Sequence, residues 1–505
     1  MRLFCGLFVL LLTVPASCLA AGADLIIVNA NVRTLVSAQP RAEAIAVSGG
    51  EIIAVGSTKA IRALADADTQ VIDAGGKLVL PGFNDAHVHL TAIGNLFSSV
   101  KLADVRTSKE FAERITNVAR FLPKGRWILG SGWDNRIWIP NDPPTKALID
   151  TLTPGNPVFV YNVDAKAVFV NSIALKLAGI GKDTKDPVGG MIFRDASGEP
   201  TGVLRGTAMQ MVGSLVPTNH MKNLPEIIEA ASNYAASLGV TSVQDMHSDD
   251  LGDVLRDLAR LGKLKTRVYD CTNLSNWQKL AAQKIKAASG DAMVRIGCMK
   301  SFAEDGEDLD IAQLERDIAG ADKAGLQIAI HAIGAKPNEI VLSAFEKAVK
   351  ANGPRDRRFR VEHARNATRE ALPRFAKLNT IASMQPWLFY GENGAGSDDY
   401  ERIFDARVSV AFGSDASITD FNPLLGIHAA VNSKNGISIE QAVRAYTAAS
   451  AFAEFQEKAK GTIEVGKLAD FIILSEDIFS IDRTKIRNAR IETTVVGGKI
   501  VFKQN

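Results

Sequence analysis

Residues 81–89 have the sequence Pro81-Gly-Phe-Asn-Asp-Ala-His-Val-His89, in which a turn leads into a short strand that ends in two histidines. Alternate side chains of a strand lie on the same face, so His87 and His89 can both bind one ion. A lone pair of this kind occurs easily by chance in a core or on a surface. Asp85, two residues before His87, favours a metal site. Whether one forms depends on the residues at the ends of the other predicted strands.

Seven more apolar or β-branched runs follow and alternate with helix-length segments, a pattern typical of a parallel α/β sheet. Together they predict the eight strands of a TIM-like (β/α)8 barrel: Phe83–His89, Thr241–Asp245, Arg267–Cys271, Arg295–Lys300, Gln327–His331, Arg360–His363, Thr380–Gln385 and Ser409–Asp415. The gap from Leu90 to Val240 is far too long for one helix and contains another apolar run, Val158–Val163. We predict an insertion at about residues 91–238 that decorates or covers the barrel mouth.

Both ends of the chain are rich in short β-branched runs separated by Gly, Asn and Pro turns. These runs are Asp24–Ile27, Ala44–Val47, Ile52–Val55 and Gln70–Ile72 near the start, and Asp470–Leu474, Thr493–Val496 and Lys499–Phe502 near the end. We predict one small β-sandwich formed by residues 22–80 together with 460–505. The barrel then spans residues 81–459, and the fold class is α/β.

Polar side chains close several of the predicted barrel strands. The chain has only seven histidines, yet His331 and His363 each end a separate strand, and Asp415 ends the eighth. In such barrels polar residues at the carboxyl ends of strands are typically catalytic, and we expect the interior below them to be apolar. Taken singly, either histidine is better explained as a core or rim residue. Together, four histidines and a carboxylate at four strand ends predict a metal site.

The sequence resembles the amidohydrolase superfamily, and within it the branch that includes N-substituted formamide deformylase. The resemblance covers nearly the whole mature chain, and its motifs are specific for the family but much less so for a substrate. The motifs are Asp24-Leu-Ile-Ile-Val-Asn-Ala30, Pro81–His89, Gly132-Trp-Asp134, Asn171-Ser-Ile-Ala-Leu175, the Lys300 segment, His331-Ala-Ile-Gly334, Glu362-His-Ala364, Gly413-Ser-Asp415, Gly461–Asp470 and Val495-Val-Gly-Gly-Lys499.

The resemblance implies a role for each strand-end residue and a pair of divalent ions. His87 and His89 would bind the more buried ion, and His331 and His363 the second. Asp415 would be both a ligand and the general base that takes a proton from the attacking water. These ligand types suit zinc, with manganese or iron as alternatives.

Two further positions, Lys300 and Glu362, lie near these ligands in the sequence pattern. Lys300 matches the lysine that such enzymes carboxylate with CO2 to bridge the two metals; the alternative is an interior lysine paired with Asp305 or Glu304. Glu362 precedes His363 on its strand, and strand alternation predicts that it points the opposite way and is structural.

The substrate is not assigned by the sequence. Trp133, Asp134, Trp387 and Tyr390 are candidates for lining the pocket, and each is explained equally well as a core or surface residue. Relatives often have His at the position of Lys166, and the loops after Lys300 and Gln385 are shorter than expected. We expect hydrolysis of C–N bonds other than peptide bonds, in amides or N-acyl and N-formyl compounds. The alternatives are a deaminase, lactonase or phosphotriesterase, or a metal-binding regulatory protein without turnover.

Composition limits the possible partners. Of the 505 residues 46% are hydrophobic and 23% charged, and the net charge of +2 comes from scattered Lys and Arg residues. Nothing in this charge pattern suggests a nucleic-acid footprint or a polybasic membrane patch, so we expect neither as a partner. A small-molecule substrate fits best, and a homo-oligomer stays open.

The N-terminus has the pattern of a secretory signal. Arg2 precedes an apolar run from Leu3 to Val14, and small residues follow up to Ala21. We expect residues 1–21 to be cleaved and the protein to be periplasmic or secreted, without stable membrane insertion; an uncleaved anchor is the alternative. Cys271 and Cys298 then remain, and we expect two small buried side chains rather than the disulfide that export would permit.

Overall fold

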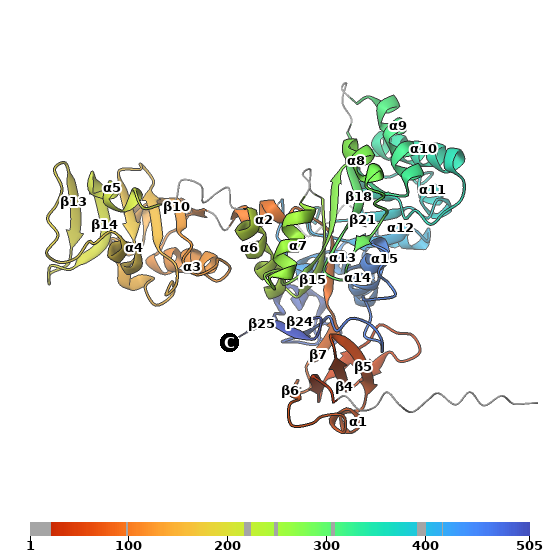
Figure 1. The fold of residues 1–505 in the computed structure, drawn as a ribbon, viewed down its shortest axis with the longest axis horizontal. Helices are drawn as coiled ribbons and strands as arrows, with labels where there is room; N and C mark the ends of the chain where they lie inside the picture. The colour runs from red at the N-terminus through yellow and green to blue at the C-terminus, as the bar shows by residue number, and fades with distance from the viewer. Residues whose placement is uncertain are drawn as a thin grey trace, which may run out of the picture.

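A parallel sheet of eight strands forms the centre of the molecule (Figure 1). The computed structural model describes residues 22–96, 99–216, 224–246, 251–304, 309–390, 400–416 and 418–504. In spatial order the strands are β8 (Phe83–Val88), β15 (Val240–Asp245), β16 (Arg267–Asn273), β18 (Val294–Ala303), β19 (Gln327–Ile333), β20 (Arg360–Arg365), β21 (Ile381–Met384) and β22 (Ser409–Phe412). A parallel bridge from Val88 to Ala416 brings the two edge strands together. The predicted α/β barrel is confirmed.

Helices cover the outside of the barrel strands, as the alternating pattern predicts. They are α2 (Leu90–Leu96), α6 (Leu224–Ser237), α7 (Gly252–Arg260), α8 (Trp277–Ala282), α9 (Ile311–Ala324), α10 (Ala335–Asn352), α11 (Leu372–Lys377), α12 (Tyr400–Asp405), α13 (Pro423–Asn432), α14 (Ile439–Ala445) and α15 (Ala448–Ala453). Helix α9 has clear local signals at both ends. Asp310 accepts a hydrogen bond from the Gln313 backbone at its start, and Gly325 ends it with φ 85°.

Two further sheets form a small sandwich from both ends of the chain. One has the order β5-β4-β1-β6 and the other β25-β24-β23-β7-β2-β3. Their strands are β1 (Leu25–Val28), β2 (Asn31–Arg33), β3 (Arg41–Ala42), β4 (Ala44–Ser48), β5 (Glu51–Gly56), β6 (Gln70–Asp73), β7 (Leu78–Pro81), β23 (Phe471–Leu474), β24 (Ile491–Val496) and β25 (Lys499–Lys503), with helix α1 (Thr58–Arg62). Ile45, Phe471 and Val495 belong to the apolar core between the two sheets.

A buried ion pair attaches this sandwich to the amino-terminal end of the barrel. Arg267, the first residue of β16, donates from Nε and Nη2 to the two carboxylate oxygens of Asp470, at 2.7 and 2.8 Å. Both side chains are buried, and Gly497 donates its backbone N–H to the same carboxylate. The sandwich lies at this end of the barrel, and the candidate functional site lies at the opposite end, where the strands terminate.

The insertion forms a sheet of its own, of order β13-β14-β12-β11-β10-β9. Its elements are β9 (Val100–Lys101), α3 (Ser108–Ala119), β10 (Ile128–Trp133), β11 (Val158–Asn162), β12 (Ala167–Val170), α4 (Ser172–Leu177), β13 (Gly190–Arg194), β14 (Pro200–Gly206) and α5 (Ala208–Gly213), with 3-10 turns at Asn135–Ile137 and Lys146–Leu148. Helices α2 and α6 pack on each other against the barrel, and we count them with the barrel. The part of the insertion that forms a separate unit is therefore shorter than the predicted residues 91–238.

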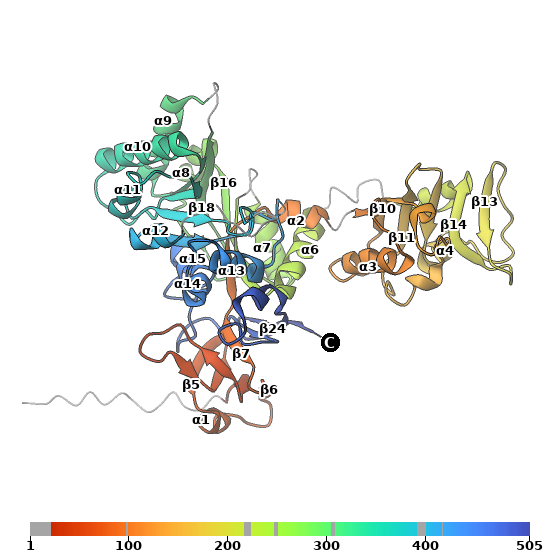
Figure 2. The same ribbon diagram turned by 180° about the vertical axis from the view of Figure 1, so that it is seen from behind.

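The described part of the insertion lies beside the barrel, against α6, and not over the strand ends (Figures 1 and 2). The Phe121 ring lies 4.9 Å from the Tyr234 ring, and Arg126 forms an ion pair with Glu226, both partners being on α6. These contacts join the described part of the insertion to α6.

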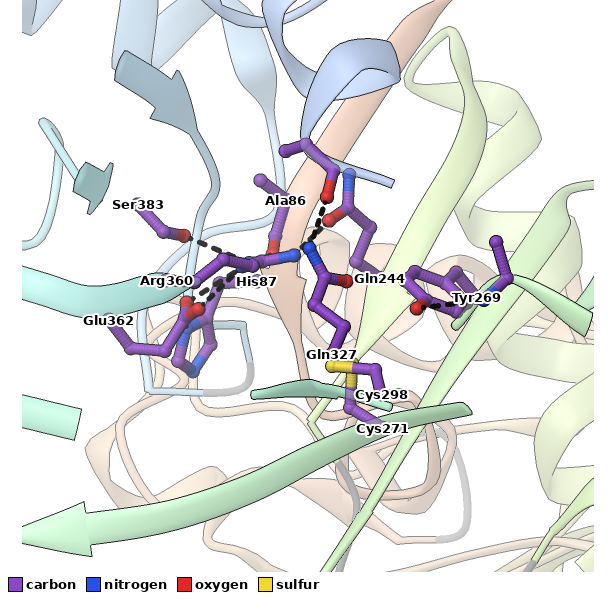
Figure 3. The surroundings of a disulfide bond; sticks show 12 residues. Ala86, His87, Gln244, Tyr269, Cys271, Cys298, Gln327, Arg360, Glu362 and Ser383 are labelled. Atoms are coloured by element: carbon purple, nitrogen blue, oxygen red, sulfur yellow. Dashed lines mark hydrogen bonds and ion pairs between the residues drawn. A yellow bond between two sulfur atoms is a disulfide. The ribbon is translucent and has the colours of Figure 1, made fainter. Parts of the chain in front are cut away.

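Cys271 and Cys298 form a disulfide between β16 and β18 (Figure 3), so the expectation of two free thiols was wrong. The two strands are neighbours, and their parallel register places Cys271 directly opposite Cys298. A separation of 27 residues along the chain gives no hint of that register. In the described ranges no helix is both long and apolar enough to cross a bilayer, and the predicted signal at residues 1–21 lies outside them.

Candidate metal centre

The structure brings all five strand-end residues together at the carboxyl end of the barrel. Donor atoms of His87, His363 and Asp415 lie within 4.8 Å of one another. His89 Nε2 is 3.2 Å from Asp415 Oδ1, and the His331 ring centroid is 4.4 Å from that of His363. Residues on β8, β19 and β20 and just after β8 and β22 thus form one cluster.

A close approach of β22 to β8 shapes one side of this cluster. A Cβ atom at Gly413 would lie 2.5 Å from the backbone nitrogen of His87, so only glycine fits there. Asp85 Oδ1 accepts hydrogen bonds from the backbone N–H groups of His87, at 3.0 Å, and Ser414, at 2.9 Å. Asp415 follows with φ 59°, a left-handed conformation that aspartate tolerates better than most residues.

Two of the histidines have their tautomer set by a partner on Nδ1. His87 Nδ1 is 2.7 Å from Glu362 Oε2, and His363 Nδ1 is 2.6 Å from Gln385 Oε1. Both acceptors require Nδ1–H, which leaves Nε2 of each ring with a free lone pair for a metal. Burial and the nearby charge of Lys300 lower the pKa of His87 to about 3, so the ring is neutral at pH 7. Burial likewise lowers the pKa of His331 to about 4.

Glu362 is a functional residue whose position the sequence pattern predicted wrongly. Regular alternation would point it away from His363, but His363 and Ala364 have φ 68° and 48°. The strand is irregular at these residues, so both Glu362 and His363 reach the centre. The Glu362–His87 pair is buried and connects β20 to β8 across the barrel (Figure 3).

Arg360 holds Glu362 in place from below. Its Nε lies 2.7 Å from Glu362 Oε1, and its guanidinium also donates to the Ala86 carbonyl, Ser383 and Gln244 (Figure 3). Burial by itself would raise the pKa of Glu362, but the Arg360 charge and the His87 hydrogen bond hold it below its usual range. The expectation of an apolar interior was therefore wrong here, because a fully buried arginine fills this layer.

Lys300 lies beside the cluster without a direct partner of opposite charge. Its side chain is 4% exposed, and its Nζ is 4.8 Å from the Phe302 ring centroid. Burial lowers its pKa to about 8, against the opposing charges of Glu362 and Asp415. No described residue forms a hydrogen bond or ion pair with its ammonium group. Glu304 lies 3.8 Å from His331 instead, and Asp305 is outside the described residues.

The four candidate substrate contacts lie in two places. Trp387 and Tyr390 stack at 5.8 Å in the loop after β21, on the same side as the cluster. Phe389, which sequence reasoning missed, places its ring 6.3 Å from His363 in the same loop. Trp133 and Asp134 line a separate pocket within the insertion, whose described lining residues all belong to the insertion.

Neutral imidazoles and a carboxylate with converging lone pairs are the donor set of a zinc-type site, so the residues fit a divalent ion. Such a cluster at the carboxyl end of a (β/α)8 barrel defines a hydrolase of the amidohydrolase type. The chain belongs to the amidohydrolase family, whose model, described as "Amidohydrolase family", matches residues 70–502. The resemblance found in the sequence is confirmed.

Known proteins resemble the chain along almost its whole length. It is 32% identical to "Protein LONG AFTER FAR-RED 3" of Arabidopsis thaliana, over 97% of this chain and 93% of that protein. It is 28% identical to N-substituted formamide deformylase of Arthrobacter pascens, over 95% and 98%. A solved structure of an uncharacterized metal-dependent hydrolase from Pyrococcus furiosus is similar with a TM-score of 0.61 and 26% identity, over 90% and 100%.

We predict that Glu362→Gln lowers metal affinity about 10- to 100-fold, because His87 loses the anion that orients it and raises its basicity. Competition with a chelator measures the affinity, and circular dichroism checks that the variant is folded. Glu440→Gln, which changes an exposed ion pair with Arg444, is the matched control and should bind metal normally. Equal affinities for the two variants would contradict the role given to Glu362.

Proposed function

We propose that the protein hydrolyses C–N bonds other than peptide bonds, in small amides or N-acyl and N-formyl compounds. The observation that carries this proposal is the cluster of His87, His363 and Asp415, in which acceptors on Nδ1 orient both rings. The similarity to a formamide deformylase over nearly the full length of both chains supports the choice of bond.

The proposed centre holds two divalent ions, with zinc as the first expectation. His87 and His89 would hold one ion and His331 and His363 the other, with Asp415 as a further ligand. We infer that Lys300 is carboxylated on Nζ, which would turn an unpaired buried cation into an anionic ligand between the ions. Two such ions, when bound, would supply acidification of a water and polarisation of the scissile carbonyl.

The chain's own residues would perform the proton transfers and the positioning. Asp415 Oδ1 is within 3.5 Å of Nε2 of both His87 and His89, so it borders the place where the attacking water has to sit. Its carboxylate would accept the proton of that water and pass it to the leaving nitrogen. Glu362 and Gln385 would keep His87 and His363 oriented throughout.

The first test is the variant Asp415→Asn. An amide keeps the shape and one acceptor oxygen but cannot take a proton at neutral pH. We expect kcat to fall about 10²–10⁴-fold, with the fold and at least one metal retained. His87→Ala, by contrast, should lose metal first. Rates on a panel of amides, formamides, esters and lactones and elemental analysis measure both effects.

The same panel tests the class of reaction. Turnover of lactones or esters but not of amides would replace the proposed substrate class and leave the site intact. Near-normal amide turnover by Asp415→Asn would show that Asp415 is not the base.

The second test concerns metal content. The purified wild-type protein should contain close to two divalent ions per chain, because both histidine pairs are present, and Lys300→Met should contain at most one. Elemental analysis decides this. A wild-type protein that is fully active without metal refutes the proposed centre, and two ions in Lys300→Met refute the bridging role.

We also propose that the protein is exported, to the periplasm or beyond. The pattern of Arg2 and the apolar run from Leu3 to Val14 supports this. Cell fractionation followed by N-terminal sequencing should find a chain that begins near Ala21 outside the cytoplasm. An intact N-terminus confined to the cytosol would refute export.

A further inference from the structure

The insertion contains a pocket that the proposed reaction does not use. Its volume is about 270 Å³, and every described residue that lines it belongs to the insertion. The lining includes two aromatic side chains, Trp133 and Phe193, and five charged ones: Asp134, Arg136, Asp164, Lys166 and Arg205. The pocket is thus separate from the metal centre in residues and in chemistry.

The pocket lies where α/β sheets commonly bind ligands. Strands β10 and β11 are parallel neighbours, and Trp133 and Asn162, which are paired in the ladder, stand at their carboxyl ends. In open α/β sheets, ligands bind outside the carboxyl ends of parallel strands. The position in the sheet therefore points to a binding site, independently of the residues that line it.

A β-bulge fixes one wall of the pocket. The register between β10 and β11 shifts between Ser131 and Trp133, and Gly132 between them has φ 98°. Bulges of this kind re-aim side chains next to sites. The Trp133 indole donates to the Val160 carbonyl at 3.0 Å and is 5% exposed, so its ring is a rigid apolar surface.

Two positively charged side chains of the pocket have no contact with a negative charge among the described residues. Arg136 occupies both oxygens of Asp134, at 2.7 and 2.8 Å, and Asp164 accepts from Asn162 and from a backbone N–H. The Lys166 ammonium and the Arg205 guanidinium form no hydrogen bond or ion pair with any residue in the described part of the chain. Both side chains are exposed at the pocket.

We propose that this pocket binds a small organic carboxylate. Lys166 and Arg205 bind the carboxylate, for which a guanidinium offers two parallel N–H donors. Trp133 and Phe193, whose side chain is 38% exposed, contact the apolar part of the ligand. The aromatic walls favour an organic acid over inorganic phosphate or sulfate. The site does not depend on the metal centre or on the reaction proposed for it.

Calorimetric titration of the full-length protein with phenylacetate tests this proposal. 2-Phenylethanol has a similar shape without the charge and contains no hydrolysable bond, so it is the matched ligand control. The variant Lys166→Gln/Arg205→Gln removes both cations, and Lys176→Gln removes an exposed cation on α4 that does not line the pocket. Thermal unfolding checks that each variant is folded.

We expect the double variant to bind phenylacetate about 10- to 100-fold more weakly than the wild type, as loss of hydrogen bonds to a charged group predicts. Lys176→Gln should bind as the wild type does. Because the metal centre is the same in all of these proteins, the difference isolates the pocket. Equal affinity of wild type and double variant, or equally tight binding of 2-phenylethanol, would overturn the proposal. Neither result depends on whether amides are hydrolysed.

Discussion

The carboxylate of Glu362 lies between the guanidinium of Arg360 and the imidazole of His87 in the closed centre of the barrel. A buried charge is tolerated only when it is paired and hydrogen-bonded, and here the two charges neutralise each other. Arg360 also reaches Gln244 on β15 and the Ala86 carbonyl on β8. The same contacts therefore hold opposite sides of the barrel together and present Nε2 of His87 to the site, so fold and chemistry rest on one network.

The two ends of the barrel have different tasks. At the amino-terminal end, the Arg267–Asp470 pair attaches the sandwich and leaves no charge uncompensated. At the carboxyl end, burial lowers the pKa values of His87 and His363, and acceptors on Nδ1 orient both rings. A centre built in this way loses little entropy when it binds an ion, because its ligands are already in place. Lys300 is the one ligand candidate that requires a chemical change before it can contribute.

The insertion is built as a unit separate from the barrel. It has its own sheet, its own core and a pocket at the carboxyl ends of its parallel strands. The relatives match the chain over almost all of its length, so the insertion is part of the region of similarity. Lys166 and Arg205, the two cations of the proposed carboxylate site, both line that pocket.

The sequence by itself was sufficient to predict the eight barrel strands, the β-rich ends and the four histidines and Asp415 at strand ends, because strand periodicity and the position of a residue at a strand end are local properties. It could not predict the role of Glu362, which depends on positive φ angles at His363 and Ala364. It could not predict the disulfide, because that bond requires the register of β16 against β18. It also could not predict Arg360 in the barrel interior, because its hydrogen-bond partners Gln244 and Ala86 are more than a hundred residues away in the sequence. Only the tertiary structure decides such contacts, because they depend on which strands become neighbours and not on the pattern within any one of them.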